Sequence, residues 1–152
     1  MINLPYRPCV GVMLINPKGH IFTAERLDMP GAWQMPQGGV DDGEEHLEAA
    51  LRELEEETSV PRSAVTFLKQ SADWINYDLP DNLLGKVWGG KYRGQKQHWF
   101  LMQFNGSDEL INLETEQPEF SHWKWSTREQ LIAEIVPFKQ AVYQAVVKEL
   151  LG

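Results

Sequence analysis

The stretch from Gly38 to Val60 reads GGVDDGEEHLEAALRELEEETSV and decides the fold. Nine of the 22 acidic residues of the chain lie between Asp41 and Glu57, and Arg52 is the one Lys or Arg among them. Nine acids and one base give this segment a formal charge of −8, which equals the net charge of the whole chain. In the rest of the chain the acidic and basic residues are equal in number, so their charges cancel. Excess charge gathered in one short segment indicates a site for multivalent cations rather than a solvated acidic tail.

The same segment has the periodicity of a helix. Its apolar stripe, at about 100° per residue, comprises Leu47, Ala50, Leu51 and Leu54. Glu53, Glu56 and Glu57 follow the i, i+3, i+4 pattern and form a second cluster beside that stripe. The spacing therefore predicts one helix that has an apolar face and a carboxylate face.

The carboxylate cluster opposes two physical effects. Like charges at this spacing repel by roughly 0.2–0.5 kcal/mol per pair, and Glu56 and Glu57 lie near the helix C-terminus, where the macrodipole disfavours anions. A bound cation would compensate both effects, and several carboxylate oxygens favour Mg²⁺ or Mn²⁺ over zinc. The alternative is a solvated acidic face in which Arg52 pairs with Glu56 at i+4.

The full segment resembles the Nudix box, Gly-x5-Glu-x7-Arg-Glu-U-x-Glu-Glu-x-Gly-U, in which U is aliphatic. The matching positions are Gly38, Glu44, Arg52, Glu53, Leu54, Glu56, Glu57 and Val60. Ser59 departs, because the family has Gly there, in a left-handed conformation that ends the helix. We expect Ser59 to cost on the order of 1 kcal/mol of local stability and to leave the chemistry unaffected.

Composition favours a cytoplasmic enzyme domain. A chain of 152 residues with 42% hydrophobic and 24% charged residues is long enough for one domain, over residues 1–152, with a proper core. Cys9, the single cysteine, cannot form an internal disulfide. We find no signal peptide and no run of about 20 apolar residues, so we expect no membrane association.

The predicted structure mixes strands and helices. Strands are expected at Cys9–Asn16, His20–Arg26, Val65–Gln70, Trp74–Tyr77, Gln97–Phe104 and His122–Trp125, the first two as a hairpin. Besides the helix at Glu45–Thr58, a capping box of Thr127 and Gln130 opens a helix through Ile135, and Pro137 begins another. This pattern agrees with the α/β Nudix fold that the resemblance implies, an α/β/α sandwich with a mixed β-sheet between helices.

The resemblance also implies a reaction, in which water attacks a phosphorus atom of a polyphosphate chain. Glu53, Glu56 and Glu57 would hold Mg²⁺, for which Mn²⁺ can substitute, together with the backbone carbonyl of Gly38. More than one ion is expected. Arg52 would orient the glutamates, and Glu44 would brace the loop or Arg52. Glu119, in the loop ETEQPEF, matches a glutamate that binds metal or acts as general base; on spacing alone it is an exposed loop carboxylate.

Segments outside the box resemble the RNA pyrophosphohydrolase and dinucleoside polyphosphate hydrolase branch of the family. They are YRPCVGVML, WQMPQGG, YDLP, KYRGQKQHWF, PEF, WKW and VPFKQAVY. The first expectation is hydrolysis of 5′-triphosphorylated RNA to 5′-monophosphorylated RNA, as in mRNA decay, with no DNA substrate. The alternative is asymmetric cleavage of diadenosine tetraphosphate to ATP and AMP, and a remote one is a silent nucleotide-binding module. Base preference, phosphate number, oligomeric state and protein partners stay open.

The same branch supplies candidate substrate-binding residues. They are Arg7, Arg26, Gln37, Tyr77, Phe138 and Lys139. Arg26 could instead pair with Glu25 or Asp28, and Phe138 could belong to the core. Lys91 and Arg93 lie in a glycine-rich basic insertion that could close over a polyphosphate; the alternative is a solvated insertion without ligand contact.

Overall fold

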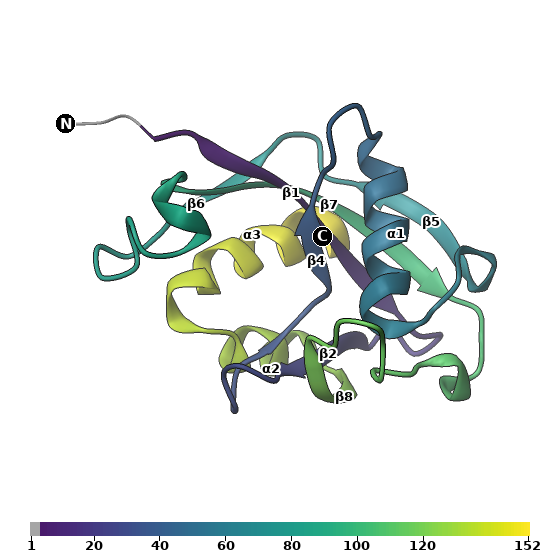
Figure 1. Cartoon of the computed structure of the whole chain (residues 1–152). Helices are drawn as coiled ribbons and strands as arrows, with labels where there is room; N and C mark the ends of the chain where they lie inside the picture. The colour runs from purple at the N-terminus through teal and green to yellow at the C-terminus, as the bar shows by residue number, and fades with distance from the viewer. Residues whose placement is uncertain (1–3) are drawn as a thin grey trace.

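The computed structural model describes residues 4–152 and is built on an eight-stranded sheet (Figure 1). Strand β1 (Tyr6–Ile15) pairs in parallel with β7 (Gly94–Phe104) and antiparallel with β2 (Ile21–Arg26). The main path is completed by β5 (Val65–Gln70) beside β7 and β3 (Trp33–Gln34) beside β2. Three further strands pair off this path: β4 (Gln37–Gly39) with β1, β6 (Ile75–Asp78) with β7 and β8 (Phe120–Ser126) with β2. The sheet is therefore mixed, as predicted.

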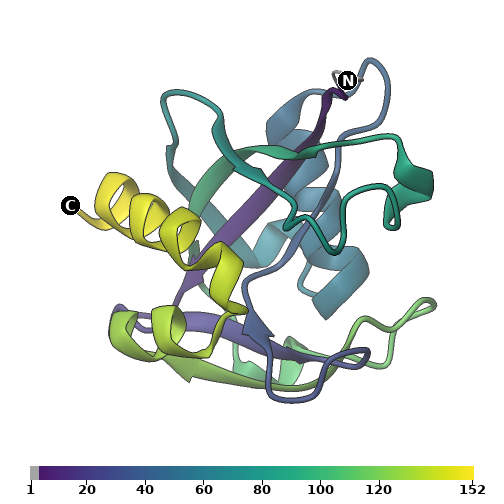
Figure 2. The same ribbon diagram turned by 90° about the vertical axis from the view of Figure 1, so that its left-hand side faces the viewer.

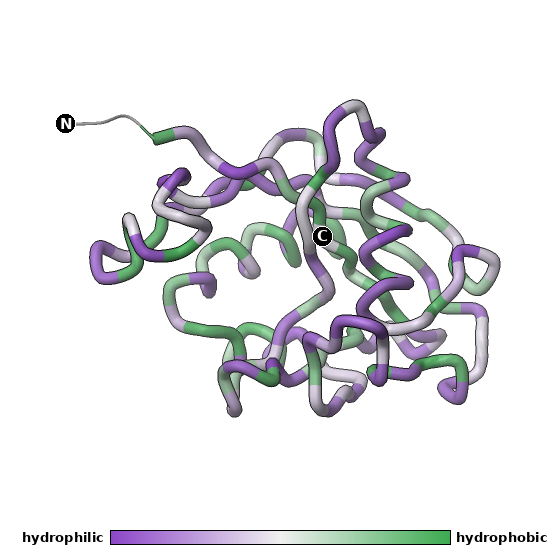
Figure 3. Tube along the Cα trace, in the orientation of Figure 1, coloured by the Kyte–Doolittle hydropathy of each residue, from purple (hydrophilic) through white to green (hydrophobic). Residues whose placement is uncertain are grey.

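Helices cover both faces of the sheet. Helix α1 (His46–Thr58) lies on one face, and α2 (Arg128–Glu134) and α3 (Gln140–Leu151) lie on the other (Figures 1 and 2). In Figure 3 the hydropathy of α1 alternates along its turns, as expected of a helix with one buried face. In the part of the chain that the structure describes, no helix combines the length and apolarity needed to cross a membrane.

Alternation along the central strands divides the core into two clusters. Met13 and Trp99 pack with α2 and α3, whereas their neighbours Val12, Leu14 and Phe100 pack with α1. This follows from the two-residue period of a strand, which sends successive side chains to opposite faces. The α/β/α sandwich and the α/β class are confirmed.

Most predicted elements are confirmed within a few residues of their bounds. The strand Val65–Gln70 coincides with β5, and the capping box of Thr127 and Gln130 is present at the start of α2. Pro137 begins a 3₁₀ turn, Pro137–Lys139, and α3 starts at Gln140. Strands β3 and β4 were not predicted, because two or three residues are too short to show an alternating pattern.

Ser59 ends α1 in the left-handed conformation that was expected, with φ 68° and ψ 2°. Its backbone N–H donates to the Glu55 carbonyl, and its Oγ donates to the Asn112 carbonyl at 2.8 Å. A hydroxyl bond that glycine could not make therefore offsets part of the backbone strain.

Candidate active site

Arg52 joins the carboxylate face of α1 to β4 and to the loop between them. Its Nε and Nη2 donate to the two carboxylate oxygens of Glu44 at 2.9 Å each, and Nη2 also donates to the Gly39 carbonyl at 3.0 Å. Its Nη1 donates to Glu53 at 2.8 Å and to Glu56 at 3.2 Å. These contacts lower the pKa of Glu44 to about 2 and raise the pKa of Arg52. One planar guanidinium thus orients three carboxylates.

Glu57 is a buried carboxylate with an open oxygen. Its residue is 6% exposed, and among the described residues its Oε2 has no hydrogen-bond partner. Burial raises its pKa well above the usual value, and Glu53 and Glu119 raise it further, against the backbone N–H of Gln37. Burying such a group without a partner costs free energy, which a cation at Oε2 would offset.

Glu53 lies directly against β4. A Cβ added to Gly38 would fall 2.1–2.5 Å from the carboxyl atoms of Glu53, so only glycine allows this approach. The carboxyl group is largely shielded, and burial raises its pKa despite the hydrogen bond from Arg52. The Glu53 carboxylate therefore packs directly against the backbone at Gly38.

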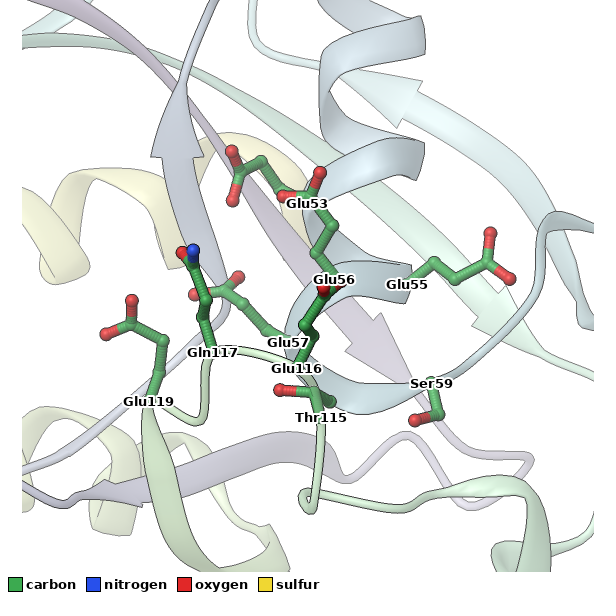
Figure 4. A pocket seen from close by; sticks show the side chains of 9 residues that line it. All are labelled: Glu53, Glu55, Glu56, Glu57, Ser59, Thr115, Glu116, Gln117 and Glu119. Carbon is green, nitrogen blue, oxygen red and sulfur yellow. The ribbon is translucent and has the colours of Figure 1, made fainter.

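The carboxylates share one cavity of about 510 Å³ at the C-terminal end of α1. Glu53, Glu56, Glu57 and Glu119 line it from α1 and from the loop before β8, and Glu55 also lines it but points away from these other carboxylates (Figure 4). Among residues 4–152, no three Asp, Glu, His or Cys side chains are already gathered as a metal centre. Arg52 holds Glu53 and Glu56 by hydrogen bonds, so the oxygens line the cavity without forming a closed ligand shell.

This donor set fits a hard divalent cation. Carboxylate and carbonyl oxygens are the ligands that Mg²⁺, Mn²⁺ and Ca²⁺ take in proteins. Among the described residues, Oε2 of Glu57 has no hydrogen-bond partner, so this oxygen is free to bind a cation.

A second cavity, of about 670 Å³, adjoins the first and shares Glu53, Glu56, Glu57 and Glu119 with it. Six predicted substrate-binding residues line it, namely Arg7, Arg26, Gln37, Tyr77, Phe138 and Lys139. The structure therefore brings these six together with the carboxylates, although they come from distant parts of the chain.

Lys139 is the most buried cation of this cavity, at 6% exposed. Burial, and then the nearby charge of Arg26, lower its pKa to about 8. Its Nζ lies 5.5 Å from the centre of the Tyr77 ring. A poorly solvated ammonium of this kind gains strongly from an anionic ligand.

Arg7 is held in place from three sides. Its Nη1 donates to Cys9 Sγ at 3.4 Å, its guanidinium lies 5.6 Å from the Trp88 ring centre, and Gly39 leaves room for Nη2. Arg7 therefore lies between β4 and the insertion that carries Trp88.

Arg26 and Phe138 each make the structural contact that was the alternative to substrate binding, and each also lines the cavity as predicted. Arg26 forms a two-pronged ion pair with Asp28, at 2.7 and 2.9 Å, and still lines the cavity. Phe138 packs against the core and against Tyr77, at 5.8 Å between ring centres, and also lines the cavity. Each side chain thus has a structural contact and a surface open to a ligand.

The structure does not support substrate contact for Lys91 and Arg93, since neither lines the cavity. Arg93 donates to Asp78 at 3.0 Å, and its guanidinium lies 4.7 Å from the Tyr6 ring centre. The insertion instead directs Leu83, Val87 and Trp88 to the cavity. Substrate contact by Lys91 and Arg93 therefore stays a prediction, because composition identifies a basic loop but not which side chains face inward.

Two glutamines of the cavity wall, Gln34 and Gln95, were missed. Gln95 and Gln97 are 3% and 1% exposed near the start of β7. They alternate with Lys96 and His98 in a segment that reads as polar, so the sequence does not show that they are buried.

Comparison with known proteins agrees with this geometry. The family model described as NUDIX domain matches residues 5–146, so the chain belongs to the Nudix family. It is 57% identical over 147 residues to the RNA pyrophosphohydrolase of Cereibacter sphaeroides, covering 96% of this chain and 91% of that protein. It is 56% identical over 150 residues to the RNA pyrophosphohydrolase of Novosphingobium aromaticivorans, covering 97% of this chain and 93% of that protein.

Solved structures share the fold at low identity. The E. coli dihydroneopterin triphosphate pyrophosphohydrolase superposes with a TM-score of 0.72 at 19% identity, covering 97% of this chain and 98% of that one. A C. elegans Ap4A hydrolase superposes with a TM-score of 0.70 at 21% identity, covering 96% and 98%. These neighbours show a Nudix fold.

Proposed function

We propose that this protein is a metal-dependent pyrophosphohydrolase that converts 5′-triphosphorylated RNA to 5′-monophosphorylated RNA. The observation that carries the proposal is a cavity that joins the half-buried carboxylate of Glu53 and the buried one of Glu57 to the cations Arg7 and Lys139. Carboxylates suit divalent ions, and the cations suit phosphate oxygens. Relatives more than 50% identical over nearly the full chain, named RNA pyrophosphohydrolase, support this substrate.

Glu53, Glu56, Glu57 and Glu119, with the backbone carbonyl of Gly38, would hold Mg²⁺, or Mn²⁺ in its place, as more than one ion. Such ions lower the pKa of bound water and offset the negative charge of the phosphates. Arg52 positions Glu53 and Glu56 through its Nη1 hydrogen bonds, so that their carboxylates do not reorganise during the reaction.

Other residues of the cavity bind and orient the substrate. Arg7 and Lys139 would contact phosphate oxygens and thereby neutralise charge that repels the attacking water. Phe138 and the guanidinium of Arg26 offer flat surfaces on which a base can stack. Glu119, when it is not bound to metal, can accept the proton of the attacking water at its carboxylate.

The proposed setting is the cytoplasm, in the processing of RNA 5′ ends during mRNA decay. The single cysteine, Cys9, is buried and cannot form an internal disulfide, so no bond within the chain requires an oxidising compartment. Diadenosine tetraphosphate is the competing substrate, because it also presents a nucleoside followed by several phosphates.

A side-by-side assay with Mg²⁺ on 5′-triphosphorylated RNA and diadenosine tetraphosphate, with the products resolved, tests the proposal. We expect higher kcat/KM on the RNA, with a 5′-monophosphate end formed. Preference for the dinucleotide, with ATP and AMP as products, would overturn the assignment in favour of the competing activity. Absence of turnover on both would identify a nucleotide-binding module without catalysis.

A further inference from the structure

Three side chains on one face of β7 form a buried chain of hydrogen bonds that ends at the substrate cavity. Trp99 Nε1 donates to Gln97 Oε1 at 2.9 Å. Gln97 Nε2 in turn donates to Gln95 Oε1 at 2.7 Å and to Gln37 Oε1, on the neighbouring β4, at 3.2 Å. Trp99 and Gln97 are 0% and 1% exposed and do not line the cavity, whereas Gln95 and Gln37 do.

The chemistry of the indole fixes the direction of every bond in this chain. An indole N–H can only donate, so the oxygen of the Gln97 amide must face Trp99. The Gln97 nitrogen then faces Gln95 and Gln37, and both of those residues must accept with their oxygens. Amide orientation is usually ambiguous in a structure, but here the donor-only end of the chain removes the ambiguity.

Because the oxygens of Gln37 and Gln95 accept from Gln97, the amide nitrogens of these two residues are free to face the cavity. Within the described residues, Nε2 of Gln37 and Nε2 of Gln95 have no acceptor. The buried side-chain atoms without a partner do not include them, so both nitrogens are open to solvent. The wall beside Arg7 and Lys139 therefore presents the nitrogens of two amide groups, whose carbonyl oxygens accept from Gln97.

We infer that Gln97 and Trp99 are positioning residues that set Gln37 and Gln95 as hydrogen-bond donors to the phosphate oxygens of the substrate. The inference rests on the proposed function for the identity of the substrate as a polyphosphate. Preset donors bind an anion without reorganising, whereas a free amide would expose its carbonyl oxygen to the phosphates part of the time. The buried amides thus contribute specificity for an acceptor-rich ligand.

Gln97→Glu reverses the polarity at the centre of the chain with little change in shape. A carboxylate only accepts, and Trp99, Gln95 and Gln37 can all donate to it. The two outer amides must then turn their nitrogens inward and their oxygens toward the cavity. We expect the Kd for inorganic tripolyphosphate, measured by calorimetry on the metal-free protein, to rise at least about tenfold, at an unchanged fold.

An uncharged variant separates positioning from simple charge repulsion. Gln97→Met together with Trp99→Phe removes the chain and leaves no buried indole N–H without a partner. The outer amides are then free to rotate, and we expect the Kd for tripolyphosphate to rise about threefold. The side-chain amide signals of Gln37 and Gln95, followed by NMR, should shift on tripolyphosphate addition in the wild type. They should shift less in both variants.

The kinetic readout distinguishes this role from a purely structural one. On the RNA substrate, both variants should raise KM more than they lower kcat. If the folded double variant bound tripolyphosphate as tightly as the wild type, the effect of Gln97→Glu would be explained by charge repulsion alone. That result would overturn the inference. Failure of the wild type to bind tripolyphosphate would overturn it as well. Wild-type binding of tripolyphosphate without any RNA cleavage would overturn the proposed function alone.

Discussion

The two ends of the substrate cavity are built in opposite ways. The carboxylate end comes mostly from glutamates of one helix, Glu53, Glu56 and Glu57, of which the single guanidinium of Arg52 holds the first two. The cationic and aromatic end is assembled from β1, β6 and the turn before α3, which supply Arg7, Tyr77 and Lys139. The first end depends on a local network of ionic hydrogen bonds, and the second on how distant elements pack.

This difference predicts how each end responds to change. Substitutions at the carboxylate end should act mainly on kcat, because they remove groups that hold metal ions or orient those that do. Substitutions at the other end should act mainly on KM, because they remove charge and surface that bind the substrate in ground and transition state alike.

Glu56→Gln should have the largest effect. It keeps the size of the side chain but removes a charge that we propose binds metal, so we expect kcat to fall about a thousandfold or more. The side chain is 57% exposed, so the melting temperature should hardly change. Glu55→Gln is the matched control, because Glu55 points away from the other carboxylates (Figure 4). Near-normal turnover by Glu56→Gln with Mg²⁺ would remove this residue from the metal site.

Arg52→Lys should have the next largest effect. One ammonium cannot serve Glu44, Glu53, Glu56 and the Gly39 carbonyl together, as the planar guanidinium does. We expect kcat to fall roughly 10–100-fold, with a lower melting temperature. Arg62→Lys, at an exposed pair with Glu48, should leave both unchanged. Equal effects of the two substitutions would show that the Arg52 network is dispensable.

Lys139→Met should raise KM for the RNA about tenfold with a smaller change in kcat. Because the folded pKa of Lys139 is about 8, wild-type kcat/KM should decline as the pH rises through that value, and the variant should lose this component. Lys91→Met changes a lysine that does not line the cavity, so it should raise KM less than Lys139→Met.

Lys139 also gives a stability prediction with a defined sign. Its folded pKa lies below the unfolded value, so between about 8 and about 10.5 the unfolded state binds more protons. Wild-type stability should therefore gain a contribution as the pH rises through this window. At pH 7 the neutral side chain of Lys139→Met should give a higher melting temperature than the wild type. A lower melting temperature would contradict the desolvation that we assign to Lys139.

Ser59 should give the smallest effect. Ser59→Ala keeps the positive φ and loses the hydrogen bond to Asn112, so we expect a loss of about 0.5–1.5 kcal/mol of unfolding free energy. Ser59→Gly loses the same bond but relieves about 1 kcal/mol of strain, so it should unfold within about 0.5 kcal/mol of the wild type. Denaturant unfolding should rank Ala below Gly, with turnover unchanged in both.

The contrast between the two ends also explains what the sequence could predict. Arg52 and the glutamates around it could be placed from helical spacing, because every distance lies within one element and its adjoining loop. Lys91 and Arg93 were assigned to the substrate as members of a glycine-rich basic insertion, and in the structure Arg93 donates to Asp78. Tertiary packing decides which side chains of a long insertion face inward, and no repeating pattern in the sequence predicts this.

The glutamine chain on β7 lies between these cases. Its members alternate along one strand, but Gln95 and Gln97 lie in the polar segment that opens β7, so no local pattern marked them. Their partner Gln37 lies in β4, which is too short to predict, so the contact needed the structure. The Nudix box thus defines the carboxylate end, whereas the geometry of the substrate end comes from pairing of distant strands.

The most direct test of the carboxylate end is the melting temperature of the wild type and of Glu57→Gln, each with EDTA and with Mg²⁺. Without metal, the variant should melt at a higher temperature, because it no longer buries an unpartnered charge. With Mg²⁺, the wild type should be stabilised by ion binding to the folded state, and the variant should gain far less. A variant that melts below the wild type in EDTA and responds equally to Mg²⁺ would contradict the assignment of Glu57 to the metal.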